Sequence, residues 1–424
     1  MLYSVEQVSI ITHGLRIVNT WLTIAIVTLT YIGIALGRFP RLKTNRATVA
    51  LIGVGLLLIS GQVHFEEIGD YLDLDTLVLL FSMMVINANL RIAGFFTLAG
   101  STLLRLARTP RLLLALEIAL VGVLSALFLN DTICLMFTPL VLELTTATRR
   151  NPLPYLIALA TASNLGSVAT LTGNPQNMII GIASGIPYIE FTLALLPVAL
   201  AGMVIIWVVL VWLYRYEFTR ETFPPLPQPE QTFSRWSLTK NLIVIAALLA
   251  AFLAGVPVAL ATFLAACALL ITRRVQPQMV FAEFDWGLLV FFSGLFIVSG
   301  SLERNGITRQ LFEIVHLTRQ TGVWEFSIGT AVLSNLVSNV PAVLLLKPVT
   351  AELANPRAGW LALALASTLA GNFTLLGSVA NLIVAEIASR WRVEISFWEY
   401  LRAGAIITIL SLVLGILWIQ VFIW

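Results

Sequence analysis

The chain has 424 residues, of which 58% are apolar and 11% are charged, and its mean hydropathy is +0.93. Soluble globular proteins carry about 25% charged residues, so this composition excludes a soluble enzyme or any other water-soluble protein. The net charge of +3 is small and gives no indication of nucleic-acid binding.

Apolar segments that approach the ~20 residues needed to cross a bilayer begin near the N-terminus. We expect spans at 20–37 and 47–63, joined by the basic loop 38–46, which the positive-inside rule places in the cytoplasm. The loop 66–75 carries five acidic and no basic residues, which fits the outer face. A long third span at 76–104 then returns the chain to the cytoplasm.

The apolar stretch 112–148 is flanked by basic residues at both ends, so both ends belong in the cytoplasm. Its middle is polar and reads Asn130-Asp131-Thr132. Two arms of about 17 residues, at about 1.5 Å per residue, can reach deep into the membrane and return. The pattern predicts a re-entrant helical hairpin with a polar tip near the midplane, where protein or a water-filled cavity must surround the non-helical backbone.

The segment 154–189 is apolar except for Thr172-Gly173-Asn174-Pro175-Gln176-Asn177 in its middle. Proline and glycine interrupt helices, and the polar side chains can satisfy the freed backbone groups. We therefore expect a discontinuous transmembrane helix, followed by a span at 192–214. The Pro-rich segment 216–240 then has the composition of a linker.

The second half repeats this order, with Ser338-Asn339-Val340-Pro341 at a hairpin tip and Gly371-Asn372-Phe373-Thr374 near a helix break. Asp75 precedes Asn130 by 55 residues and Asp285 precedes Asn339 by 54. Asn164 follows Asn130 by 34 residues, and Asn372 follows Asn339 by 33. The predicted spans are 241–254, 257–272, 286–304, 358–389 and 399–422, with a hairpin at 323–350. The stretch 241–272 could also form one kinked helix.

Five crossings in each half make the two repeats inverted. The predicted fold is an all-α polytopic membrane protein, with a first repeat at 1–215, a cytoplasmic linker at 216–240 and an inverted second repeat at 241–424. Inverted repeats with broken helices place their substrate at the midplane between the halves, so the pattern predicts a secondary transporter. No phosphate-binding glycine-rich loop occurs, so we expect no ATP hydrolysis by this chain and no cofactor. The scattered histidines suggest no metal site.

Asp131 is an ionisable group in the middle of an apolar stretch, where carboxylates are costly and usually functional, so we predict that it carries or gates a proton. The alternative is that Asn130 and Asp131 only cap the second hairpin arm. Amide, hydroxyl and glycine residues at the tips and breaks are predicted to line a substrate site, although amides can also hold helices together. These candidates are Asn130, Thr132, Asn164, Gly173, Asn174, Asn177, Ser338, Asn339, Asn372, Thr374, Gly377, Ser378 and Asn381.

Two further residues are interpreted as structural. Glu117 lies close to the basic flank of the first hairpin, and we expect it to pair with Arg111, Arg149 or Arg150. Cys134 lies near the first tip, but one thiol cannot build a three-thiolate arsenic site, so we interpret it as a small buried residue.

The run from Thr172 to Gly181, the Asn130-Asp131 tip, the second tip at 338–341 and the pair Gly377-Ser378 resemble the ion transporter superfamily. Within it, the chain is most similar to the branch of arsenical pump membrane proteins and NhaD-type sodium/proton antiporters. The resemblance implies proton-driven export of arsenite or antimonite across the cytoplasmic (inner) membrane, in some members with a cytoplasmic ATPase subunit. Related divalent anion/sodium symporters carry Ser-Asn-Thr at both tips, and this chain departs from that pattern at both.

The competing hypotheses are a sodium- or proton-coupled transporter of an inorganic or carboxylic anion, a passive channel and a membrane-embedded enzyme. The paired halves and broken helices favour alternating access over a channel, and no paired catalytic residues indicate an enzyme. The expected partners are the lipid bilayer, the transported solute and H+ or Na+, with no nucleic acid. Monomer and homodimer both remain open.

The topology is directly testable. We expect both termini outside the cell and the linker 216–240 in the cytoplasm, because the basic loops and the odd number of crossings per half require it. Cysteine accessibility of tagged termini measures this orientation. A cytoplasmic N-terminus would contradict it.

Overall fold

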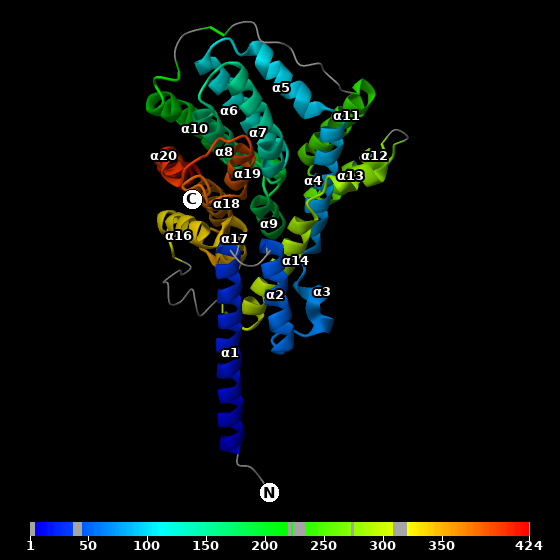
Figure 1. Cartoon of the computed structure of the whole chain (residues 1–424). Coiled ribbons are helices and arrows are strands. Elements are labelled where there is room, and N and C mark those ends of the chain that lie inside the picture. The colour runs from blue at the N-terminus through cyan, green and yellow to red at the C-terminus, as the bar shows by residue number, and fades with distance from the viewer. Residues whose placement is uncertain are drawn as a thin grey trace.

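The computed structural model describes residues 5–36, 45–218, 222–223, 234–272, 275–307 and 320–423. Every regular element in these ranges is a helix (Figure 1), which confirms the predicted all-α class. Most of the predicted loop 38–46 and much of the linker 216–240 lie outside the described residues. The proposed boundaries of the two repeats therefore stay predictions.

The helices of the first half coincide with the predicted segments in part. They are α1 (Val5–Leu36), α2 (Arg46–Ile59), the short η1 (Phe65–Glu67) and α3 (Ile68–Tyr71), α4 (Leu74–Ile92), α5 (Phe95–Leu106), α6 (Pro110–Leu127), α7 (Asn130–Ala147), α8 (Pro152–Ser167), α9 (Pro175–Ser184) and α10 (Tyr188–Leu213). The predicted hairpin is α6–α7, and the predicted discontinuous helix is α8–α9.

The second half has the same order. Its helices are α11 (Arg235–Leu253), α12 (Val258–Leu270), the short α13 (Pro277–Ala282), α14 (Trp286–Arg304), α16 (Val323–Val337), α17 (Asn339–Glu352), α18 (Pro356–Ala370), α19 (Val379–Arg390) and α20 (Phe397–Phe422). The stretch 241–272 forms two helices, because Gly255 takes a left-handed conformation with φ 78° and Pro257 follows it.

The predicted third span at 76–104 is wrong as a single helix. Gly94 has φ 81° and ψ 19°, a conformation that glycine adopts without steric cost, and the chain there divides into α4 and α5. The apolar run continues through this turn, so hydropathy alone did not reveal it. In Figure 1, α5 lies along the top of the molecule at an angle to α4.

Matching helix starts refine the repeat. The Asp73 carboxylate accepts from the backbone N–H of Thr76, and the Asp285 carboxylate accepts from that of Leu288, both at 3.1 Å. These residues cap α4 and α14, each of 19 residues. The residue equivalent to Asp285 is therefore Asp73 and not, as the spacing suggested, Asp75.

The helices gather into two groups (Figure 1). One group, here called the hairpin unit, contains α6–α10 and α16–α20, packed around α8 and α18. These two helices are buried throughout 154–167 and 358–370. The other group, the frame unit, contains α1, α2, α4, α11, α12 and α14, in which α2 packs on α14 and α12 packs on α4. Each unit thus takes helices from both halves of the chain.

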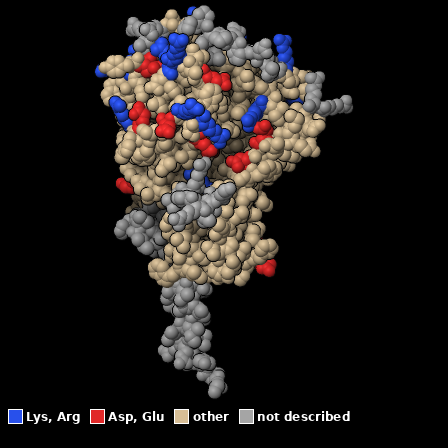
Figure 2. Space-filling model, in the orientation of Figure 1, with Lys and Arg blue, Asp and Glu red and all other residues tan. Residues whose placement is uncertain are grey.

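The surface is that of a membrane protein. Among the described residues, six helices are long and apolar enough to span a bilayer by length and composition: α4, α6, α10, α11, α14 and α20. Large apolar side chains such as Leu193, Val204 and Leu417 are exposed on them. Figure 2 shows the charged side chains gathered in the upper part of one face, above a broad area with few charges. This distribution fits a bilayer as the surrounding solvent.

The contact between α6 and α8 depends on two glycines. A Cβ atom on Gly166 would lie 2.5 Å from the Cα of Gly122, so the two backbones touch with no room for a side chain. Small residues of this kind allow close packing of membrane helices.

We expect Gly166→Ala to destabilise the protein by about 1–3 kcal/mol, because the added methyl group overpacks this contact. The control is Gly329→Ala in α16, where a Cβ meets nothing within 4 Å and should stabilise the helix by roughly 0.5–1 kcal/mol. Thermal unfolding in detergent measures both changes. Equal melting temperatures for the two variants would refute the packing argument.

Candidate functional site

Two helix breaks lie next to each other in the hairpin unit, one at 168–174 and the other at 371–378. Each break is crossed by an asparagine amide from the helix that follows it. Asn177 Nδ2 donates to the carbonyls of Ser167 (3.0 Å) and Thr170 (2.9 Å). Asn381 Nδ2 donates to the carbonyls of Gly371 (2.7 Å) and Thr374 (3.1 Å). The amides therefore satisfy the backbone groups that the breaks release.

The helices after the breaks are capped in the same way. Asn174 Oδ1 accepts from the backbone N–H of Asn177 at 2.8 Å, and Ser378 Oγ accepts from that of Ala380 at 3.3 Å. Gly173 and Gly377 sit where no side chain fits, because a Cβ would lie 2.6 Å from the Ser167 carbonyl and 2.9 Å from the Gly371 carbonyl. Asn174, Asn177 and the Thr374 carbonyl thus have structural partners within the breaks.

Asn164 on α8 connects both halves of the chain. Its Oδ1 accepts from Asn130 Nδ2 and from Ser378 Oγ, both at 3.1 Å. Its Nδ2 donates to Asn372 Oδ1 (2.8 Å) and Asn381 Oδ1 (3.3 Å). We call these five residues the asparagine cluster. All are at least 96% buried, and none is charged.

The two hairpin tips reach the breaks but differ in conformation. The Asn130 backbone N–H donates to the Gly173 carbonyl at 3.0 Å, and Asn130 Oδ1 has no hydrogen-bond partner among the described residues. At the second tip, Asn339 lies against Gly371, and its Oδ1 accepts from Ser334 Oγ at 2.8 Å. Ser338 has φ 82° and ψ 158°, a region that residues with a Cβ rarely adopt.

A cavity of about 150 Å³ lies beside the first tip, and we call it the Asp131 cavity. Asp131 and Thr132 enter it from α7, and Asn87 Nδ2 donates to Thr132 Oγ1 at 3.4 Å from α4. An ion pair between Arg91 and Glu283 forms its partly exposed side. The remaining polar group that lines it is Asp285, the cap of α14.

Sequence reasoning missed three of these residues. Asn87 and Arg91 are four residues apart in an apolar span, which places them on one helix face and was an available signal. Glu283 lies between α13 and α14, and nothing in the sequence links it to Arg91. The predicted site residues carry no basic group, but the cavity beside them has one, Arg91.

The prediction for Glu117 is wrong. Both carboxylate oxygens are buried on α6 without a hydrogen-bond partner among the described residues, and no ion pair forms with the flanking arginines. The sulfur of Cys134 is 3.1 Å from Ser163 Oγ, and the residue is fully buried, in keeping with a packing role.

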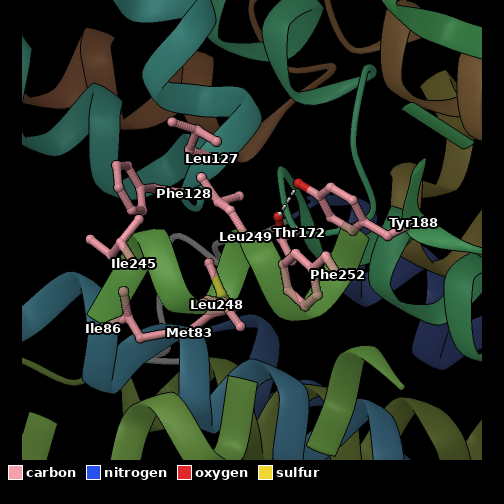
Figure 3. A pocket seen from close by; sticks show the side chains of 10 residues that line it. All are labelled: Met83, Ile86, Leu127, Phe128, Thr172, Tyr188, Ile245, Leu248, Leu249 and Phe252. Carbon is pink, nitrogen blue, oxygen red and sulfur yellow. Dashed lines mark hydrogen bonds between the residues drawn. The ribbon is translucent and has the colours of Figure 1, made fainter. Parts of the chain in front are cut away.

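An apolar layer lies between the end of α6 and α11 of the frame unit (Figure 3). Leu127 and Phe128 at the end of α6 face Ile245, Leu248 and Leu249 of α11. The Tyr188 ring stacks on Phe252 with centroids 4.3 Å apart, and its hydroxyl is 3.4 Å from that of Thr172. An adjoining apolar groove of about 380 Å³ continues between α6, α10 and α11. The contact between α11 and the hairpin unit is thus mainly hydrocarbon.

Known proteins are similar to this chain in sequence and in fold. The family model of the CitMHS citrate transporters matches residues 31–370. The silicon efflux transporter LSI3 of Oryza sativa subsp. japonica is 30% identical, over 89% of this chain and 93% of its own. The transporter arsB of Dictyostelium discoideum is 25% identical, over 88% and 87%. The crystal structure of the Alcanivorax borkumensis YdaH transporter has the same fold, with a TM-score of 0.60, 16% identity and coverage of 96% and 98%. The chain therefore belongs to the citrate transporter family of membrane transporters.

The strained second tip yields a stability prediction. We expect Ser338→Gly to stabilise the protein by about 1–3 kcal/mol, because glycine adopts this backbone conformation without steric cost. Ser338→Ala removes the same hydroxyl but keeps the Cβ, so it should bring no such gain. Thermal unfolding in detergent compares the two. An equal rise for both would assign the effect to the hydroxyl instead of the backbone.

Proposed function

We propose that this member of the citrate transporter family is a secondary active transporter that exports arsenite or antimonite across the cytoplasmic membrane, driven by protons, by alternating access. The observation that carries the proposal is the asparagine cluster, a buried group of uncharged amides and one hydroxyl contributed by both halves of the chain. Sites for transported solutes lie at such a position when repeats with broken helices meet.

The chemistry of the cluster suits a neutral solute. Arsenite in neutral water is a trihydroxide, each hydroxyl of which both donates and accepts a hydrogen bond. An asparagine side chain offers two N–H donors and one carbonyl acceptor, and Asn130 Oδ1 has no partner among the described residues. In this closed arrangement the amides bond to one another. Exchanging those bonds for bonds to the solute changes little net free energy, so binding can be weak and reversible.

The relatives support this solute class. Silicon dissolves in neutral water as an uncharged tetrahydroxide, and LSI3 of Oryza sativa subsp. japonica is named a silicon efflux transporter. The hydroxides of silicon, arsenic and antimony present the same donors and acceptors at similar size. The name arsB of the Dictyostelium discoideum relative points the same way.

Asp131 is the proposed proton carrier. It adjoins Asn130 in the chain, so it occupies the same tip as the cluster, and it faces the Asp131 cavity. A proton bound there would act on the segment that touches the solute.

The alternative is a sodium- or proton-coupled transporter of an inorganic or carboxylic anion. The family description, citrate transporter, and the guanidinium of Arg91 in the cavity favour it. Arg91 is already paired with Glu283, however, and no cation lies in the asparagine cluster. These contacts favour the neutral solute.

Expression in a cell that lacks its own arsenite pump should raise resistance to arsenite and antimonite. Asn130→Ala and Asn339→Ala should each abolish this resistance, because each substitution removes the amide side chain of one hairpin tip. Cys134→Ser should keep it, since a thiol is not needed to bind the trihydroxide. Growth inhibition and uptake into everted vesicles measure the outcome.

Membrane levels of each variant, measured on immunoblots, are the control. Unchanged arsenite sensitivity with the wild-type chain, together with citrate- or sulfate-dependent transport in the vesicles, would replace this proposal with the anion alternative.

A further inference from the structure

The Asp131 cavity lies between the two units of the molecule. Asp131 and Thr132 belong to α7 of the hairpin unit, whereas Asn87 and Asp285 belong to α4 and α14 of the frame unit. Any movement of one unit against the other changes the distance between these groups. The cavity is thus placed where a bound ion could control that movement.

The charges around the cavity do not balance. Three carboxylates line it: Asp131, Glu283 and Asp285. Two guanidiniums oppose them, Arg91 in its ion pair with Glu283, and Arg46, which interacts electrostatically with Asp131 from the half-buried start of α2. The lining residues on α19 are the uncharged Val379 and Ile383. With each of these groups ionised, one negative charge remains in excess among the described residues.

Asn87 supplies a second, independent observation. It is 4% exposed, and its Oδ1 has no hydrogen-bond partner among the described residues. A buried carbonyl without a donor costs about 1–3 kcal/mol. Its Nδ2 donates to Thr132 Oγ1, and this hydrogen bond fixes the orientation of the amide. The amide oxygen then has no donor. The missing partner is a hydrogen-bond donor.

A protonated carboxyl group is such a donor, and an ionised one is not. One bound proton therefore has two effects in the cavity. It neutralises the excess negative charge, and it supplies an O–H group that can donate to Asn87 Oδ1. A metal ion fits less well, since no group of three or more His, Cys, Asp or Glu side chains converges for a metal anywhere in the described ranges.

We propose that Asp131 binds one proton at the interface between the two units, with Asn87 Oδ1 as the acceptor of the protonated acid and Asp285 as the carboxylate whose repulsion the proton removes. The coupling role of this site rests on the proposed function. Without the proton, two carboxylates from different units line one cavity, and their repulsion opposes the contact between the units. With it, the repulsion ends and a hydrogen bond to α4 forms, so loading favours the closed arrangement.

The test uses the purified full-length protein in detergent, without arsenite, melted at a series of pH values between about pH 5 and pH 9. A proton bound by the folded protein and released by the unfolded chain stabilises the fold at low pH, and this stabilisation is lost as the pH rises. We expect the melting temperature of the wild type to fall accordingly. Asp131→Asn should reduce this fall, and Asp285→Asn and Asn87→Leu should each move its midpoint to lower pH. Glu117, a second buried carboxyl without a hydrogen-bond partner among the described residues, contributes equally to every variant.

Asp73→Asn is the matched control. Asp73 caps α4 through the same bond, of the same length, that Asp285 makes to α14, but it does not line the cavity. Asparagine can cap a helix as aspartate does, so both variants keep their caps. The Asp73→Asn curve should therefore follow that of the wild type.

A wild-type pH response in Asp131→Asn would overturn the proton site, and a wild-type midpoint in Asp285→Asn would overturn the role given to the Asp285 carboxylate. Stabilisation by sodium chloride, but not by choline chloride, at fixed pH would overturn the choice of a proton. Because no solute is present, these results do not depend on arsenite export. A failure of arsenite resistance in cells would refute the solute assignment and leave the proton site standing.

Discussion

The structure depends on one constraint, that backbone N–H and C=O groups inside a bilayer must find partners within the protein. An unbroken helix meets this constraint most simply, but the two helix breaks at 168–174 and 371–378 leave backbone carbonyls without helical hydrogen bonds. Asn177 and Asn381 resolve this by donating to carbonyls within the breaks. Once these amides are fixed, the helices after the breaks start at defined points, and the hairpin tips can pack against them.

The same tip serves two environments. Asn130 faces the buried asparagine cluster, and the next two residues, Asp131 and Thr132, face the cavity beside the frame unit. Consecutive residues at the start of a helix point in different directions, about 100° apart, so one short segment can touch both. A solute in the cluster and a proton in the cavity would therefore act on the same turn of α7. Coupling by such an arrangement needs no long pathway through the protein.

Much of the fold could be predicted because the long apolar segments of the sequence indicate membrane helices. The spacing of Asn130, Asn164, Asn339 and Asn372 indicates the repeat. The split at Gly94 was missed because the apolar run continues through it. The ion pair of Arg91 and Glu283 joins residues far apart in the chain, which one sequence cannot reveal. The amide residues near the breaks could be named from the sequence by their type, but their division between backbone support and the asparagine cluster depends on geometry.

The hydrocarbon layer between α11 and the hairpin unit has a mechanical consequence (Figure 3). Hydrogen bonds fix a register, whereas aliphatic side chains attract without a preferred direction. Two surfaces of this kind can slip past each other with little friction, and the neighbouring groove leaves space for side chains that are displaced. The rate of such sliding would follow the fluidity of the surrounding lipid, so a stiffer bilayer would slow the exchange between the two arrangements of the units.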